Sequence, residues 1–218
     1  MASVPHTANL TEGHKRVIIA SSLGTIFEWY DFYLYGSLAA IITVQFFSGV
    51  NETTGFIFAL MAFAAGFAVR PFGAIVFGRL GDLWGRKNLF LAGITLYMLG
   101  SLLSGLAGDT LLLNAGRLLT GLGAGVFNPQ VIGFIQSNFH GRARGRAYGL
   151  FGTVVGLGVA VGPLLGGLFL GAFGPEWGWR STFLMNVPVG LAAVAMGALW
   201  LPPPTRVHGL PPAPGPRG

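Results

Sequence analysis

Six long runs of apolar residues, separated by short polar segments, constrain this sequence more than any other feature. A helix needs about 20 mainly apolar residues to cross the hydrocarbon core of a bilayer, and each run is about that long or longer. In lipid, the backbone polar groups of a helix are all satisfied within the segment itself. The sequence therefore predicts an all-α integral membrane protein with six transmembrane helices. The runs are approximately Val17–Phe47, Phe56–Phe77, Leu89–Ala107, Leu111–Phe139, Tyr148–Phe173 and Thr182–Leu201.

The composition supports this prediction and excludes several classes of function. Only 9% of the 218 residues are charged, whereas a soluble domain carries about 25%. There is no cysteine, and the four histidines lie far apart, so the sequence predicts no disulfide, no metal site and no cofactor. The net charge of +6 does not indicate nucleic-acid binding, because all but two of the basic residues lie in the polar segments outside the apolar runs. No nucleophile–base pair or phosphate-binding loop suggests an enzyme.

The basic residues predict how the chain is oriented. If all six helices cross, ten basic residues fall on one side and a single one, Arg180, on the other, together with Glu52, Asp109 and Glu176. Cytoplasmic loops carry an excess of lysine and arginine, so both termini are expected in the cytoplasm and the protein in the cytoplasmic membrane. The ten residues are Lys15, Arg16, Arg79, Arg86, Lys87, Arg142, Arg144, Arg146, Arg206 and Arg217.

Three segments follow from these patterns: a cytoplasmic N-terminal tail over residues 1–15, a six-helix bundle over 16–201 and a tail over 202–218. Seven prolines fall among the last seventeen residues, which excludes a regular helix or strand interior there. We expect this tail to be disordered. The abrupt loss of the apolar pattern near residue 202 also suggests a truncation or frameshift.

Four ionisable residues lie inside the apolar runs: Glu28, Asp31, Arg70 and Arg117. A charge in the bilayer costs at least ~2.5–3.5 kcal/mol, so unpaired, lipid-facing charges are not expected. At 1.5 Å per residue, Glu28 and Arg117 both lie about 18 Å from the cytoplasmic surface. The sequence therefore predicts that they meet if the first and fourth helices are neighbours. Two interpretations are open: a carboxylate that binds and releases a proton, or a structural ion pair.

Glu28 and Asp31 share one helix face with Tyr35, as expected for the wall of a cavity. Trp29 lies deep in the same helix, away from the helix ends where interfacial tryptophans are usual. We therefore include Tyr35 and Trp29 among the candidate cavity residues.

The segment between the second and third runs, Gly78–Lys87, resembles the signature loop of the major facilitator superfamily, G-x-L-[AGS]-D-[RK]-x-G-R-[RK]. Leu83 stands where a basic residue is usual. The resemblance implies a cytoplasmic gate in which Asp82 and Arg86 take part; the alternative is a simple topology signal. The matching positions are Gly78, Leu80, Gly81, Asp82, Gly85, Arg86 and Lys87.

Two branches of that superfamily are represented. Residues 15–88 resemble metabolite:proton symporters, through Glu28–Gly36 and Phe67–Gly73. Residues 89–201 resemble fourteen-helix drug:proton antiporters, through Arg117–Ala124, Gly158–Gly167 and Trp179–Gly190.

The fifth run carries a G-x-x-x-G-P-x-x-G-G element that resembles one in the antiporters. In that group the element is thought to shape exchange, but glycines four residues apart also allow close helix packing. Both interpretations are open here. The element consists of Gly158, Gly162, Pro163, Gly166 and Gly167.

The resemblance implies proton-coupled transport of a small solute, with a slight preference for symport. Drug:proton antiport is the alternative within that class, and a membrane fragment that acts only by association is the alternative outside it. Superfamily members have two six-helix halves around a midplane site, so this chain corresponds to the N-terminal half. The expected partners are the lipid bilayer, protons, a small-molecule substrate and a C-terminal half or second copy. Glu28 or Asp31 would carry the proton and Arg117 would tune it.

Overall fold

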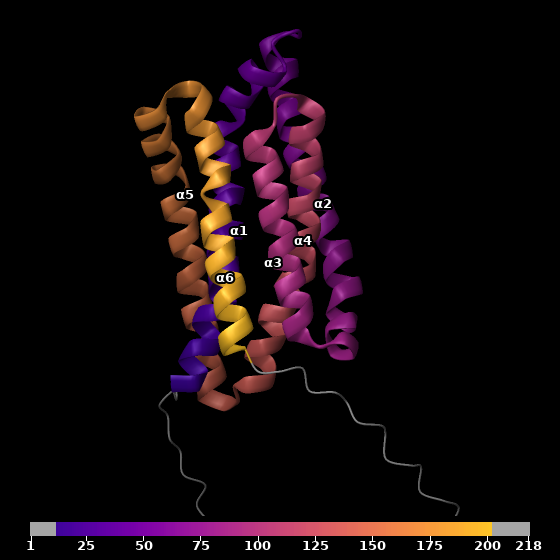
Figure 1. The fold of residues 1–218 in the computed structure, drawn as a ribbon, viewed down its shortest axis with the longest axis vertical. Coiled ribbons are helices and arrows are strands. Elements are labelled where there is room, and N and C mark those ends of the chain that lie inside the picture. The colour runs from indigo at the N-terminus through magenta and orange to yellow at the C-terminus, as the bar shows by residue number, and fades with distance from the viewer. Residues whose placement is uncertain (1–11, 202–218) are drawn as a thin grey trace, which may run out of the picture.

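The computed structural model describes residues 12–201, with side chains from residue 18 onward except at positions 21, 27, 62, 65 and 69. The described chain is helical throughout apart from short turns, so the all-α prediction is confirmed for this part. The helices lie side by side, and α1 begins and α6 ends at the same end of the bundle, the lower end in Figure 1. They are α1 (Glu12–Phe46), α2 (Glu52–Trp84), α3 (Arg86–Leu106), α4 (Thr110–Asn138), α5 (Gly141–Leu184) and α6 (Asn186–Trp200).

Several helices extend beyond the predicted runs, and α6 begins later than predicted; two of these differences bear on the site. The expected loop between the second and third runs is wrong, because α2 continues to Trp84 and only Gly85 separates it from α3. Gly85 has φ 90°, a left-handed conformation that glycine adopts without steric cost. The polar residues before it extend the helix out of the apolar layer instead of ending it. Within α5, Gly174 has φ 76° and is not helical, so the chain turns there, one residue after the predicted end of the fifth run.

The helices pack in a pattern that repeats between the first three and the last three. α1 packs against α5 as α4 packs against α2, α1 contacts α6 as α4 contacts α3, and α3 and α6 contact each other. Glycine makes the α2–α4 contact possible. A Cβ on Gly66 would lie 2.8 Å from the backbone oxygen of Arg117, and one on Gly73 would lie 2.9 Å from the Cα of Gly125. These small residues let the two backbones touch.

The antiparallel pair α3 and α6 is held by a cation at each end. Lys87, at the start of α3, donates to the carbonyls of Ala198 and Leu201 at the end of α6, over 2.6 and 3.0 Å. Arg180, before α6, donates to the carbonyl of Gly105 at the end of α3, over 3.1 Å. The last carbonyls of a helix lack intrahelical donors and carry partial negative charge, so both cations are well placed.

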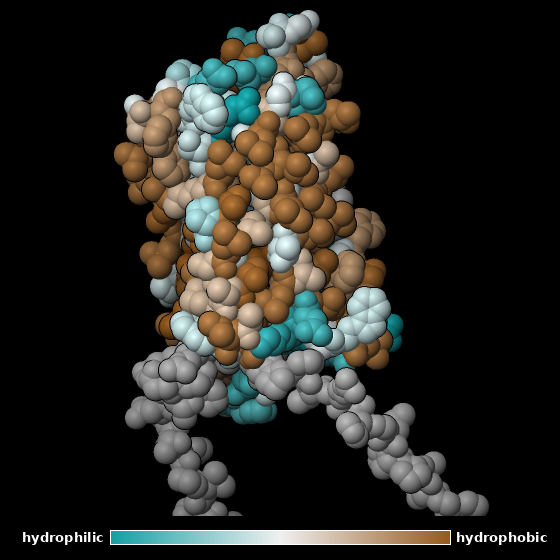
Figure 2. All heavy atoms as spheres, viewed as in Figure 1, coloured by the Kyte–Doolittle hydropathy of each residue, from teal (hydrophilic) through white to brown (hydrophobic). Residues whose placement is uncertain are grey.

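The surface has the pattern of a membrane protein. Figure 2 shows an apolar middle with hydrophilic side chains gathered towards the two ends. By length and composition, four helical stretches of the described chain qualify as membrane spans: Glu52–Trp84, Arg86–Leu106, Thr110–Asn138 and Gly141–Trp200. The last contains α5 and α6 together. α1, which carries Glu28 and Asp31, is not among them.

Most of the two predicted tails lies outside the described residues. Of the segment 1–15, only the part from Glu12 onward is described, and it is already helical. The proposed truncation or frameshift near residue 202 also lies outside this range. The orientation with both termini in the cytoplasm stays a prediction.

Candidate functional site

Glu28 lies where α1, α2 and α4 meet. It is 2% exposed, and its Oε1 accepts hydrogen bonds from Arg70 Nη1 at 2.7 Å and from Asn128 Nδ2 at 2.9 Å. Its second oxygen, Oε2, is buried and has no hydrogen-bond partner among the described side chains. A charged group in an apolar environment needs such donors, and here both act on one oxygen. The other oxygen accepts from neither of these two donors.

Asp31, one helical turn further along α1, forms a separate pair with Arg117 of α4. Arg117 Nη1 donates to Oδ1 at 3.1 Å and Nη2 donates to Oδ2 at 2.6 Å. The guanidinium also lies over the rings of Tyr35 and Phe183, 5.0 and 5.4 Å from their centroids. This two-pronged geometry satisfies both carboxylate oxygens.

The structure therefore brings the four predicted charges together, but not in the predicted pairs. Glu28 binds Arg70, and Arg117 binds Asp31. Three residues of helix rotate a side chain by about 300°, so the two acids point about 60° apart around α1. The predicted pairing of Glu28 with Arg117 used only the depth of each residue in the membrane and did not consider this rotation.

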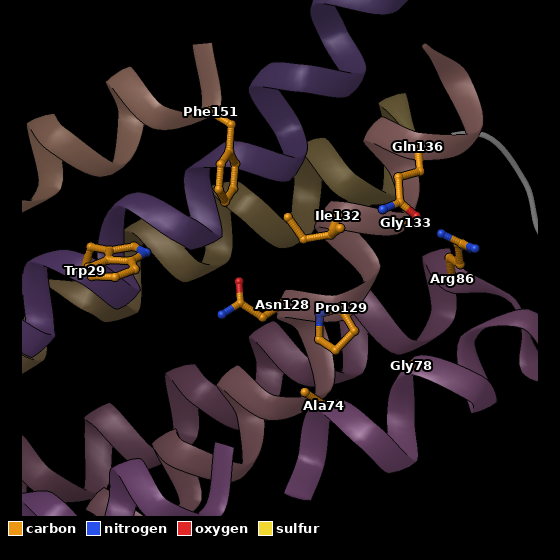
Figure 3. A pocket seen from close by; sticks show the side chains of 10 residues that line it. All are labelled: Trp29, Ala74, Gly78, Arg86, Asn128, Pro129, Ile132, Gly133, Gln136 and Phe151. Atoms are coloured by element: carbon orange, nitrogen blue, oxygen red, sulfur yellow. The ribbon is translucent and has the colours of Figure 1, made fainter. Parts of the chain in front are cut away.

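Two cavities lie beside these pairs. One, of about 240 Å³, is bordered by Arg70 together with aromatic side chains that include Trp29, Phe32 and Phe67. The other, of about 500 Å³, extends towards the lower end of the bundle and is shown in Figure 3. Its lining residues are Trp29, Ala74, Gly78, Arg86, Asn128, Pro129, Ile132, Gly133, Gln136 and Phe151.

The two cavities share Trp29, Ala74 and Asn128, so they are parts of one hollow along the inner face of the bundle. Asn128 and Gln136 are eight residues apart on α4, which places them about 12 Å apart along the helix. The hollow thus reaches from the level of the Glu28 pair to the level of Arg86. Among the described residues that line it there is no carboxylate.

Trp29 and Tyr35, both candidates from the sequence, lie differently. The indole of Trp29 points into the larger cavity (Figure 3) and also borders the smaller one. Tyr35 lines neither cavity. It is fully buried, its hydroxyl donates to the carbonyl of Ala59 at 3.3 Å, and its ring stacks on Phe63 with centroids 5.2 Å apart. Its place is beneath Arg117, as part of the packing that holds the second ion pair.

The segment Gly78–Lys87, which we call the gate segment, makes three sets of contacts. Asp82 and Arg86 pair at the lower end, with Arg86 Nε and Nη2 donating to Oδ1 over 3.2 and 2.8 Å. The Arg86 guanidinium occupies the space that Gly133 of α4 leaves by having no side chain. Lys87 is committed to the end of α6 instead.

The glycines of the gate segment face α4. Gly81 packs against the Gln130 side chain, which donates to the carbonyl of Phe77 at 2.8 Å. Gly78 borders the larger cavity. The turn between α2 and α3 is therefore attached to α4.

The glycine element of α5 lies on α1. Added Cβ atoms would meet the Ile26 carbonyl at 2.6 Å from Gly158, the Tyr30 carbonyl at 3.0 Å from Gly162 and the Leu34 side chain at 2.6 Å from Gly166. Gly167 has open space around it, and Pro163 is exposed. Packing alone accounts for the first three glycines. Nothing in these contacts explains Gly167.

Asn128 was not among the residues selected from the sequence. It precedes Pro129 in the interior of an apolar run, where an amide side chain and a helix-breaking residue adjoin each other. A polar group inside a membrane span marks a functional position by default. The prediction considered only charged side chains within the apolar runs. The same argument applies to an amide, so the sequence could have indicated Asn128.

Comparison with known proteins identifies the family of this architecture. A family model described as the Major Facilitator Superfamily matches residues 21–216. The chain is 38% identical over 128 residues to a "Probable actinorhodin transporter" of Streptomyces coelicolor, a match that covers 59% of this chain and 22% of that protein. It is 30% identical over 189 residues to the proline/betaine transporter of Escherichia coli, covering 81% of this chain and 38% of that protein. The chain therefore spans well under half of either relative.

The fold itself resembles that of solved transporters. The POT family transporter PepTSo superimposes with a TM-score of 0.71 at 20% identity, over 92% of this chain and 39% of that one. At this identity the likeness concerns the fold alone. The proline/betaine match covers too much of the chain to end at residue 88, so it continues into the stretch that resembles drug antiporters.

Proposed function

Because this chain belongs to the Major Facilitator Superfamily, we propose that it forms the N-terminal six-helix half of a proton-coupled secondary transporter. Its solute is small and crosses the cytoplasmic membrane through the hollow beside Glu28. The single observation that carries this proposal is the buried pairing of Glu28 with Arg70, since Arg70 also lines the smaller cavity. The protonatable carboxylate of Glu28 is thus in direct contact with Arg70, a residue that a solute in the cavity can reach.

The geometry favours Glu28 over Asp31 as the proton carrier. Both oxygens of Asp31 are bound by one guanidinium, which itself is fixed between two aromatic rings. Glu28 has one oxygen without a partner. Protonating Glu28 at this oxygen leaves its two existing donors in place, whereas protonating Asp31 disrupts a carboxylate whose two oxygens both accept hydrogen bonds. In this proposal Asp31 and Arg117 hold α1 against α4, and Arg117 influences Glu28 only through that packing.

We place the lower end of the bundle in the cytoplasm. That end carries Arg79, Arg86 and the basic residues near the α4–α5 turn. Cytoplasmic loops carry an excess of positive charge, so this arrangement favours a cytoplasmic position for that end. The hollow along α2 and α4 then opens towards the side on which Asp82 and Arg86 lie. A C-terminal half or a second copy is required to cover it.

Symport is the coupling mode that we prefer. Residues 15–88, which contain Glu28 and Arg70, resemble metabolite:proton symporters, and a proline/betaine transporter matches most of the chain. Drug:proton antiport is the second candidate, favoured by the higher identity to the "Probable actinorhodin transporter" over a shorter stretch. The hollow is bordered by arginines and aromatic rings rather than by acids, which argues against an apolar cation as the solute.

The test is flux through the full chain reconstituted in sealed vesicles with an imposed pH gradient. We expect labelled proline or glycine betaine to accumulate on the side towards which protons flow, and Glu28→Gln to abolish this accumulation. Glu52→Gln is the matched control, because Glu52 is exposed in the first turn of α2. Efflux of a cationic dye instead would establish the antiport alternative. Well-inserted protein without gradient-driven movement of any of these probes would refute transport by this half alone or as paired copies, and would favour a fragment that acts by association.

A further inference from the structure

Asn128 lies between the buried Glu28 carboxylate and the hollow. It donates to Glu28 Oε1 over 2.9 Å and borders both cavities. Glu28 itself borders neither cavity and is 2% exposed. A solute in the hollow therefore cannot touch the carboxylate. It reaches Glu28 only through the two donors that bind Oε1.

These two donors are not equivalent. Arg70 carries a permanent positive charge, so it attracts the carboxylate whatever else it binds. Asn128 is neutral, and its amide has one face on Glu28 and another on the hollow. In Figure 3 its oxygen and nitrogen both point into the space between Trp29 and Ile132. A solute group that bonds to this amide changes the direction in which the nitrogen donates, and so changes how strongly the ionised form of Glu28 is held.

The α2 and α4 backbones touch one helical turn before Asn128, at the level of Arg70. Gly125, one turn before Asn128, lies against Arg70 and Gly73 of α2. A Cβ there would come within 3.2 Å of the Arg70 carbonyl oxygen and 3.1 Å of the Gly73 Cα. Contact between the two helices at this level places both donors on the same carboxylate oxygen. Pro129 follows directly and cannot donate to the Gly125 carbonyl, so the α4 backbone is less constrained at this point than elsewhere.

We infer that Asn128 is the coupling residue of this half: the neutral amide through which occupancy of the cavity is transmitted to the buried Glu28 carboxylate. This inference rests on the proposed function, since it requires that Glu28 carry the proton. Asn128 is a positioning residue for Glu28 and a contact for the solute. Its removal is therefore expected to separate solute movement from proton movement, which the loss of a purely structural contact would not do.

Two assays on the full chain in vesicles distinguish these effects, with labelled proline as the probe. Accumulation driven by a pH gradient requires coupling. Counterflow, the exchange of labelled for unlabelled proline without a gradient, requires solute binding and translocation only. For Asn128→Ala we expect accumulation to fall roughly tenfold more than counterflow, because counterflow loses only a solute contact whereas accumulation also loses a hydrogen bond to a charged group.

Two variants support the comparison. Asn138→Ala removes the same side chain from the same helix, but at the lower end, where its amide bonds to the Phe134 carbonyl; it is expected to behave as wild type in both assays. Asn128→Asp keeps the shape but cannot donate when ionised, and it is expected to lose accumulation at least as completely as Asn128→Ala. Elution of each variant as wild type on size exclusion confirms that it has folded.

The outcomes are separable. Accumulation by Asn128→Ala equal to wild type overturns the inference and leaves the proposed function intact. Equal losses of counterflow and accumulation also overturn it, because they indicate a binding or structural role without coupling. If wild type itself exchanges proline but shows no gradient-driven accumulation, the proposed proton coupling is refuted, and with it the inference.

Discussion

Replacing Asp31 by asparagine is expected to destabilise the bundle by about 3–5 kcal/mol, the usual cost of leaving one member of a buried ion pair without its partner. The relative exposures of the Arg117 and Asp31 side chains are 3% and 0%, so water cannot solvate the Arg117 guanidinium that is left without its partner. Asparagine has nearly the same shape and retains one acceptor. The effect therefore reports the loss of charge from a pair with bonds of 2.6 and 3.1 Å, not a cavity.

The measurement is the thermal unfolding midpoint in detergent. For a chain of this size each kcal/mol lowers the midpoint by about 2–4 °C, so Asp31→Asn should lower it by roughly 6–20 °C. The double variant Asp31→Asn/Arg117→Gln removes both charges and is expected to be more stable than either single variant. Asp82→Asn serves as an exposed control, since the Asp82 side chain is 63% exposed and such pairs contribute about 0–1 kcal/mol.

Two results would refute this reasoning. One is an Asp31→Asn protein that unfolds within about 2 °C of wild type, which would mean that the pair is hydrated or absent. The other is a double variant less stable than both single variants, which would mean that packing rather than charge dominates at this position.

Three further outcomes are expected. Gly133→Ala places a methyl group where the Arg86 guanidinium lies, so it should detach the α2–α3 turn from α4 and increase tryptic cleavage there; unchanged cleavage would contradict this contact. Gly158→Ala should destabilise the α1–α5 contact by about 1–3 kcal/mol, whereas Gly167→Ala, with open space around it, should leave the unfolding midpoint unchanged; equal effects would contradict this packing. Because the chain has no cysteine, a single Gly108→Cys can be labelled selectively, and an impermeant maleimide applied to intact cells should reach it; labelling only after permeabilisation would reverse the proposed orientation.

The sequence alone was sufficient for the helical class, for approximate helix positions and for the set of buried charges. These features depend on local quantities, namely the length of each apolar run and the presence of a charged side chain within it. The predicted end of the fifth run at Phe173 falls beside the turn at Gly174, because glycine followed by proline marks that turn in the chain itself. The family could also be predicted, since its signature lies in one contiguous segment, Gly78–Lys87.

The loop prediction for that segment failed for a physical reason. Charged residues and glycines were expected to end the second helix where it leaves the apolar layer. Water does not end a helix, however, and α2 continues through Asp82 to Trp84. Only the positive φ of Gly85 separates α2 from α3.

Only the tertiary structure decided which charges pair, because pairing depends on how each helix is rotated about its axis and on which helices are neighbours. Glu28 and Arg117 lie at similar depths, yet Arg117 binds Asp31 and Glu28 binds Arg70. The same holds for Asn128, whose donation to Glu28 joins residues 100 positions apart in the chain. Depth follows from counting residues along one helix, whereas direction follows from the packing of several helices, to which the glycines of α2 and α4 contribute by letting their backbones touch.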